Sequence, residues 1–163
     1  DNLTRAETER EITEIRDELE QGGYIKSKKG SKNKKEKPLP PMEFTSSDGF
    51  RILVGRNNVQ NDILTLKTAM NYDMWLHVQK HAGSHTVIIA DRKEITETAI
   101  YEAACIAAYN SKAKNSSSVP VDYTLIKNVK KPTGAKPGKV IYNTYNTLYV
   151  TPTKELVEKL KRQ

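Results

Sequence analysis

The chain has 163 residues and a mass of 18.4 kDa, which is enough for one ordinary domain and too little for two catalytic domains. It is 29% charged and 36% hydrophobic, with a mean hydropathy of −0.70 and a formal net charge of +7. Its apolar stretches are far shorter than the roughly 20 residues of a membrane-spanning helix, so a membrane span is excluded. Because the chain begins at Asp1, we expect it to be a piece of a longer or processed protein.

The positive charge is concentrated in two short segments. Residues 26–37 and residues 112–139 each hold seven lysines and one acid, which gives each a net charge of +6 and leaves −5 for the remaining residues. Concentrated lysine attracts polyanions, with nucleic acid as the first candidate and anionic lipid or glycosaminoglycan as alternatives. For residues 26–37 a solvating linker explains the charge equally well.

The first part of the chain is expected to precede the globular domain. Residues 1–21 combine capping-box spacing at Thr4 and Glu7 with a narrow apolar stripe, which favours a helix. This helix is either the end of a coiled-coil arm or packed on the domain edge. Residues 22–41 hold glycine, serine, lysine and proline without apolar periodicity, so we predict a basic flexible linker. The globular domain is expected over residues 42–163.

Short strands and helices alternate within this domain. The predicted elements are strands 42–45 and 50–54, a short helix ending at Met70, strands 74–78 and 86–90, a helix over 96–111, strands 121–126, 140–142 and 147–150, and a helix over 154–161. Asn61 or Asp62 is expected to cap the short helix. Its buried face is predicted to carry Ile63, Leu66 and Met70. The pattern predicts an α+β fold, a largely antiparallel sheet with two to three packed helices, preceded by the end of a coiled-coil helix.

The densest polar segment is residues 55–62, Gly-Arg-Asn-Asn-Val-Gln-Asn-Asp. At a strand-to-helix junction these residues offer an arginine fork for phosphate, amides for base edges or backbone, and free N–H groups. The alternative is that asparagine and aspartate cap the helix and fix a tight turn, although six polar side chains exceed what capping needs. The binding candidates in this segment are Arg56, Asn57, Asn58, Gln60, Asn61 and Asp62.

The only tryptophan and all three histidines lie within residues 75–85. A Gly-Ser-His turn shows no sign of the serine–histidine–acid arrangement of a hydrolase, and the histidines lack a further metal ligand at suitable spacing. We therefore expect no catalytic residue, no metal site and no cofactor. Structural hydrogen bonding is the alternative for the histidines, and we favour the interpretation that His77, Ser84 and His85 line a site shared with residues 56–62.

The only cysteine, Cys105, excludes an internal disulfide and zinc sites built on several cysteines. Because Cys105 lies in an alanine-rich helical run, we expect it to be a small core residue.

Residues 130–139, Lys-Lys-Pro-Thr-Gly-Ala-Lys-Pro-Gly-Lys, are predicted to form a basic hairpin loop. The prolines restrict the backbone, so the lysines are presented at a smaller ordering cost than in a random tail. Nearby tyrosines can stack on bases, but tyrosines in strands are more often half-buried packing residues, so we expect one or two to face a ligand. The lysines are Lys130, Lys131, Lys136 and Lys139, and the tyrosines are Tyr123, Tyr142, Tyr145 and Tyr149.

Several independent strings point to one family. They are GRNNVQND at 55–62, LTLKTA at 64–69, DMWLHV at 73–78, AGSHTVII at 82–89, EAACIAAYNSKA at 102–113, VDYT at 121–124 and VKKPTGAKPGKVIY at 129–142. In this order they resemble the NFACT-R domain, the RNA-binding domain of NFACT proteins, whose bacterial members were first named fibronectin-binding protein A. The resemblance covers roughly residues 42–152. Ala82 stands where the family usually has proline, and Lys139 where an apolar residue is frequent.

The resemblance implies a component of ribosome-associated quality control. Such proteins bind the large ribosomal subunit with a stalled peptidyl-tRNA and, in bacteria, recruit alanyl-tRNA for template-free addition of a C-terminal alanine tail. The implied partners are the large subunit, rRNA and tRNA in the cytoplasm, and the ribosome performs the chemistry, so the domain is not expected to be an enzyme. Charge and motif density add Lys67 to the RNA-binding candidates. The competing hypothesis is a cell-surface adhesin that binds fibronectin through the same lysines.

Overall fold

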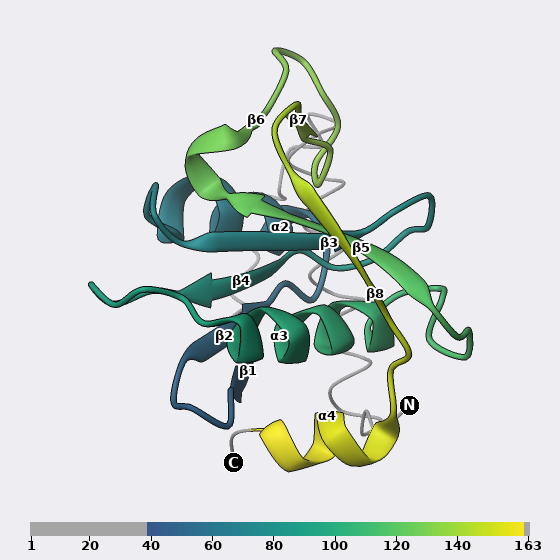
Figure 1. Ribbon diagram of the computed structural model, residues 1–163. Helices are drawn as coiled ribbons and strands as arrows, with labels where there is room; N and C mark the ends of the chain where they lie inside the picture. The colour runs from purple at the N-terminus through teal and green to yellow at the C-terminus, as the bar shows by residue number, and fades with distance from the viewer. Residues whose placement is uncertain (1–38, 162–163) are drawn as a thin grey trace, which may run out of the picture. The chain divides into compact units, whose positions relative to one another are not determined.

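The computed structural model describes residues 39–161 (Figure 1). The predicted helix over 1–21 and nearly all of the predicted linker over 22–41 lie outside the described residues. The chain divides between Pro40 and Pro41 into two compact units, and every described helix and strand belongs to the second unit.

A six-stranded sheet organises this unit. Its strands are β1 (Met42–Thr45), β2 (Arg51–Val54), β3 (Met74–Val78), β4 (Thr86–Ile89), β5 (Val119–Leu125) and β8 (Asn146–Val150). Their order across the sheet is β1-β2-β4-β3-β5-β8, and every neighbouring pair is antiparallel. The predicted α+β fold with a largely antiparallel sheet is therefore confirmed.

Alternating side chains on the strands build two apolar clusters, one on each face of the sheet. In β3, Leu76 and Val78 belong to one cluster and Trp75 to the other. In β2, Ile52 and Val54 lie in the first cluster while Leu53 lies in the second. Because both faces are apolar at the centre, both must be covered by other parts of the chain.

Two helices, α3 (Glu97–Tyr109) and α4 (Lys154–Leu160), contribute to the first cluster. Figure 1 shows α3 crossing in front of the sheet. The buried face of α3 is made mostly of small residues, so the helix can lie close on the strands. Cys105 is among them with no exposed surface, as its sequence context predicts.

The opposite face is covered by a short helix and a hairpin. Helix α2 (Asn58–Ile63) continues directly into a π-helical segment, η1 (Leu64–Thr68). A 3-10 turn, η2 (Ile126–Asn128), leads into β6 (Val129–Lys130), which pairs with β7 (Ile141–Tyr142) as a separate two-stranded sheet. The predicted basic hairpin loop is thus present between β6 and β7, on the face of the sheet opposite α3.

The short helix differs from its prediction in both its start and its buried face. Its cap is Asn57, whose Oδ1 accepts from the Gln60 N–H at 2.9 Å, so the helix begins earlier than a cap at residue 61 or 62 implies. The predicted inward residues are exposed: Ile63 by 46%, Leu66 by 40% and Met70 by 58%. A π turn, closed by the Ala69 N–H donating to the Leu64 carbonyl, breaks the 3.6-residue periodicity on which that prediction was based.

Substitution of Ala103 in α3 tests the close approach of this helix to the sheet. Ala103 has no exposed surface, so Ala103→Leu forces extra atoms into a filled core and is expected to destabilise the chain by about 1–3 kcal/mol. Urea denaturation measures the difference. The control Thr98→Leu introduces the same side chain at an exposed position of the same helix and is expected to change stability by less than about 0.5 kcal/mol. Equal effects of the two substitutions would contradict the close packing.

Candidate nucleic-acid interface

Aromatic rings lie at the base of the face opposite α3. Trp75 is 1% exposed, and its ring stacks on that of His77 with 5.7 Å between centroids and 10° between planes. The ring of Tyr142 leans on Trp75 at 4.8 Å, and the edge of His85 meets Trp75 at 5.3 Å. Strand β3 supplies Trp75 and His77, whereas the hairpin strand β7 supplies Tyr142, so distant segments share one aromatic cluster.

Asp122 holds the hairpin end of this cluster in place. It pairs with His77 in the β3–β5 register and is 4% exposed. Its carboxylate accepts hydrogen bonds from Gln79 Nε2 at 2.6 Å, Thr147 Oγ1 at 2.7 Å and Tyr142 Oη at 2.6 Å. Burial raises the pKa of the Tyr142 phenol, and the bond to Asp122 raises it further, so Tyr142 keeps its proton and remains a donor.

His85 joins the sheet to the basic loop. Burial, together with the neighbouring His77, lowers the pKa of His85 to about 4, so the ring is neutral at pH 7. Its Nε2 lies 3.0 Å from the Gly138 carbonyl oxygen, which can only accept, so we place the single ring hydrogen on Nε2. Nδ1 then accepts from the Thr65 hydroxyl at 2.7 Å, and both nitrogens of His85 are satisfied.

Asn61 is buried at the corner where β2 meets α2. It is 3% exposed, and its Oδ1 accepts from the His85 backbone N–H at 3.1 Å. Gly55 is required beside it, because a Cβ at residue 55 would lie 1.9 Å from Asn61 Oδ1. Asn61 is one of the predicted RNA contacts, but its side chain is buried and has a structural role at this corner.

Asp62 and Lys131 clamp the basic loop onto α2. Lys131 Nζ lies 3.1 Å from Asp62 Oδ2 and also donates to the carbonyls of Lys136 at 2.6 Å and Lys139 at 3.2 Å. Asp62 Oδ1 accepts from the Gly138 N–H at 3.0 Å. An ammonium has three donors, and these three partners use them, so Lys131 closes the loop instead of projecting from it.

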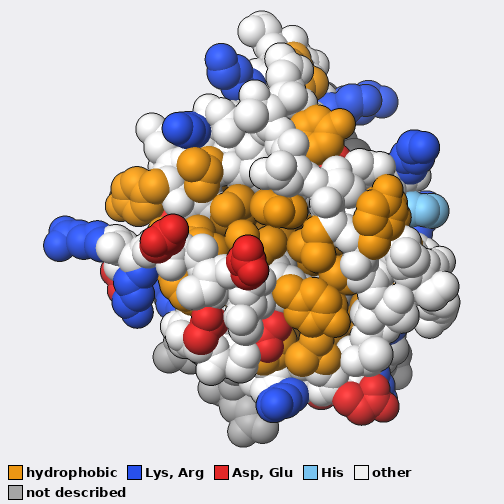
Figure 2. All heavy atoms as spheres, viewed as in Figure 1, with side chains coloured by type: hydrophobic (Ala, Val, Ile, Leu, Met, Phe, Trp, Pro, Cys, Tyr) orange, Lys and Arg blue, Asp and Glu red, His pale blue; other side chains and the backbone are white. Residues whose placement is uncertain are grey.

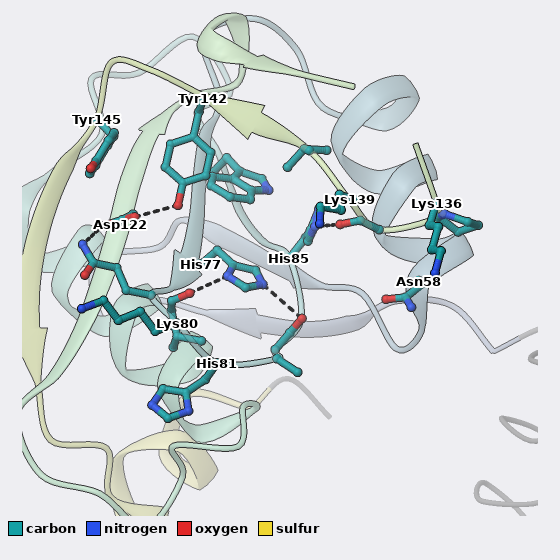
Figure 3. Close-up of a pocket in the computed structure, with 18 residues that line it drawn as sticks. Asn58, His77, Lys80, His81, His85, Asp122, Lys136, Lys139, Tyr142 and Tyr145 are labelled. Atoms are coloured by element: carbon teal, nitrogen blue, oxygen red, sulfur yellow. Dashed lines mark hydrogen bonds between the residues drawn. The ribbon is translucent and has the colours of Figure 1, made fainter. Parts of the chain in front are cut away.

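A cleft of about 910 Å³ opens above the aromatic cluster. Figure 3 shows Tyr145 at one end of the cleft, Asn58 and Lys136 at the other, and Lys80 and His81 along its side. Five residues predicted from the sequence line this cleft: Asn58, His77, His85, Lys136 and Lys139. Two of the four loop lysines, Lys136 and Lys139, and one residue of the polar corner, Asn58, therefore line the same cleft.

The remaining predicted contacts lie around the cleft. Asn57 and Gln60 form the first turn of α2, where the Gln60 side chain accepts from the Arg56 N–H at 2.6 Å. Lys67 and Lys130 are exposed and Ser84 is partly buried, and none of the three is a lining residue. For these residues, contact with RNA stays a prediction.

Four lining residues with polar or charged side chains were not among the predicted contacts: Gln79, Lys80, His81 and Asp122. Gln79, Lys80 and His81 belong to the Trp–His segment over residues 75–85. Asp122 could have been found only with the β3–β5 register, which pairs it with His77. Within residues 39–161 no group of three or more His, Cys, Asp or Glu side chains is placed to hold a metal, and no helix is both long and apolar enough to cross a membrane.

The face that carries α3 has a different character. Figure 2 shows hydrophobic side chains gathered at its centre with acidic side chains among them, while lysine and arginine lie toward its outline. The centre of this face does not offer phosphates a concentrated positive surface. The cleft on the other side of the sheet is therefore the stronger candidate for contact with a polyanion.

The family of the chain follows from comparison with known proteins. The family described as "NFACT protein RNA binding domain" matches residues 41–144. The chain belongs to this family. The resemblance seen in the sequence is confirmed, and the cleft and the basic loop lie within the matched NFACT region apart from Tyr145.

Two bacterial proteins that are similar to this chain share one name. The "Rqc2 homolog RqcH" of Bacillus subtilis (strain 168) is 51% identical over 155 residues, which cover 94% of this chain and 27% of that protein. The "Rqc2 homolog RqcH" of Streptococcus suis (strain 05ZYH33) is 43% identical over 152 residues, which cover 93% of this chain and 27% of that protein. The chain thus spans about a quarter of the length of these relatives.

A solved structure shares the fold. It is described as "The structure of the C-terminal of the fibronectin/fibrinogen-binding protein from Streptococcus suis (FBPS)", and it matches with a TM-score of 0.84 and 42% identity. The match covers 94% of this chain and 61% of that chain.

Because of His85, the NFACT domain is expected to become less stable as the pH is lowered. The ordinary pKa of 6.5 applies to the unfolded chain, and burial lowers it to about 4 in the folded one, so the unfolded chain binds the proton first. The stabilisation is complete above pH 6.5 and decreases toward pH 4, by up to about 3 kcal/mol. Urea denaturation across this range is expected to show a smaller pH dependence for His85→Gln than for the unchanged chain. The exposed His81→Gln is the control, and identical profiles for both variants would contradict the assignment.

The clamp on the loop is tested by Lys131→Met. This change removes the ammonium that joins Asp62 to two loop carbonyls, and we expect faster hydrogen exchange at the Gly138 N–H and a loss of about 1–3 kcal/mol in stability. The adjacent Lys130→Met removes an equal charge from an exposed side chain and serves as the control. Equal exchange rates at Gly138 in the two variants, measured by NMR, would show that Lys131 does not hold the loop.

Proposed function

We propose that the chain is the RNA- and ribosome-contacting domain of a protein of ribosome-associated quality control. The family is described by RNA binding, and the relatives are named as homologues of Rqc2. The single observation that carries the proposal is the basic loop clamped beside an aromatic-lined cleft by Asp62, Lys131 and His85. A loop held in this way presents its lysines to phosphates without a large ordering cost.

Lysines from two separate parts of the sequence support this assignment. Lys136 and Lys139 of the basic loop line the cleft, and Lys80, from the connection between β3 and β4, lines it as well. Their positive charge at one opening is suited to a phosphate backbone.

The finer assignment concerns the complete protein. We propose that the domain helps its parent protein to engage stalled large subunits with tRNA in the cytoplasm and so supports template-free C-terminal alanine tailing. Its contribution is binding, and we assign no catalytic step to it. The chain spans about a quarter of the length of its relatives, so this activity also requires parts of the protein beyond this chain.

Adhesion to a host glycoprotein is the second candidate. It is favoured by the description of the structural relative from Streptococcus suis as a fibronectin/fibrinogen-binding protein. Exposed lysines can attract an acidic glycoprotein as well as RNA, so the two functions must be separated by specificity and by salt dependence.

Charge reversal at the loop provides the test. The double variant Lys136→Glu/Lys139→Glu is expected to bind purified large ribosomal subunits and tRNA at least about tenfold more weakly. Each lost phosphate contact also lowers the slope of log affinity against log salt by about 0.7–0.9. The control Lys154→Glu reverses a single exposed charge, at the first turn of α4, where an acid is favourable, and is compared with Lys136→Glu alone as well as with the double variant. Filter binding or sedimentation over a range of salt concentrations measures these effects.

The same assay decides between the two candidates. If the unchanged chain binds fibronectin tightly at high salt and ignores ribosomal subunits and tRNA, the adhesin is correct and the RNA-binding proposal fails. If Lys154→Glu weakens RNA binding as much as the loop variant does, the cleft face is not the interface.

A further inference from the structure

We infer that the cleft receives one unpaired nucleotide of an RNA strand, with its base against Tyr145 and Tyr142 and its phosphates at Lys136 and Lys139. The inference rests on the proposed function and goes beyond it, because RNA binding alone needs only exposed lysines. It assigns a ligand to the cleft itself: a single base removed from the stack of its neighbours.

The aromatic end of the cleft is suited to a planar ligand. Tyr145 is 46% exposed, and its ring meets that of Tyr142 edge to face with centroids 5.1 Å apart. Tyr142 is held by its bond to Asp122 and by contact with Trp75, so the half-buried wall beside Tyr145 is fixed in advance. Stacking on a preformed aromatic surface is the usual way in which proteins hold bases of single strands.

The opposite end of the cleft supplies positive charge. Lys136 and Lys139 lie there beside Asn58, while Lys80 lies along the side, as Figure 3 shows. The only carboxylate in the lining, that of Asp122, is 4% exposed and already accepts three hydrogen bonds. The charge available to a ligand is therefore positive, which favours a phosphate-bearing occupant over a cationic peptide.

The polar groups at the base of the cleft are committed to one another. His77 Nδ1 lies 2.6 Å from the Val78 carbonyl oxygen and its Nε2 lies 3.2 Å from that of Gly83. Both nitrogens of His85 have partners, and both donors of the Gln79 amide face Asp122 and Thr147. These groups are therefore not available to read the edge of a base, and the contact rests on stacking, which tolerates any base.

An RNA duplex is a poor occupant of this cleft. Paired bases are stacked, and their faces are covered by the neighbouring pairs, so those faces are not available to the tyrosine rings. A base must leave the stack first, which costs a few kcal/mol in a duplex and much less in a loop or single strand. The structure therefore points to single-stranded or looped segments of RNA.

A binding experiment with short RNA tests this inference on the 163-residue chain. The probes are labelled eight-nucleotide strands of adenine or of uracil and a duplex of eight G·C pairs, which stays paired under the conditions of the assay. We expect both single strands to bind, and the duplex to bind at least about tenfold more weakly. Trp75 is the only tryptophan of the chain and lies under the cleft, so its fluorescence reports directly whether a base enters.

Matched tyrosine variants separate stacking from charge. Tyr145→Ala is expected to weaken single-strand binding by about 5- to 150-fold, the usual effect of removing one stacking ring, while Tyr145→Phe retains binding. Tyr101→Ala is the control, because Tyr101 is 48% exposed, close to the 46% of Tyr145, and lies on α3 across the sheet. Thermal unfolding of each variant shows whether the fold is intact.

The outcomes distinguish this inference from the proposed function. If Tyr145→Ala leaves single-strand binding unchanged while Lys136→Glu/Lys139→Glu weakens it, only phosphates are bound, and the inference fails while the proposed function stands. Equal binding of duplex and single strands, or binding with no change in Trp75 fluorescence, overturns the inference in the same way. If large subunits are bound but no short RNA is, the inference fails while the proposed function stands. Absence of binding to any RNA or ribosomal subunit rejects both proposals.

Discussion

The candidate site depends on the attachment of a single backbone residue, Gly138, to the corner between β2 and α2. Its N–H donates to Asp62, and its carbonyl accepts from His85 Nε2. Its φ of +83° lies in the left-handed region that favours glycine, and a Cβ there would lie 2.6 Å from Asn58 Oδ1. Without these contacts and the Lys131–Asp62 ion pair, the loop would be held by a hairpin of only two residues in each strand.

The lysines of the loop divide into two groups with different physical roles. Lys131 turns inward, and its ammonium is shared between the carboxylate of Asp62 and two carbonyls of its own loop. The backbone carbonyls of Lys136 and Lys139 accept these hydrogen bonds from Lys131, while the side chains of both residues remain exposed at the cleft. The charge of Lys131 therefore holds the loop, and the charges of Lys136 and Lys139 are available to a ligand. The net charge of the loop does not show this division.

Sequence periodicity predicted most of the fold, because alternation along the strands records which side chains face each apolar layer. The α+β class, the antiparallel hairpins and the alanine face of α3 all follow from this pattern. The face of the short helix did not, since a five-residue π turn changes the spacing after Ile63. Asn57 takes the cap one turn earlier than expected, and that shift places Asn61 in the interior.

The sequence by itself determined which chemistry is available: a lysine-rich loop stiffened by prolines, an amide-rich corner, and a short segment with tryptophan and histidines. Only the tertiary structure decided which of these groups meet a ligand and which meet each other. Asn61, Asp62, His85 and Lys131 look like surface contacts in the sequence, but they are used to join distant segments. The physical reason is that residue type fixes how many hydrogen bonds a group can make, whereas packing across the sheet fixes with whom it makes them.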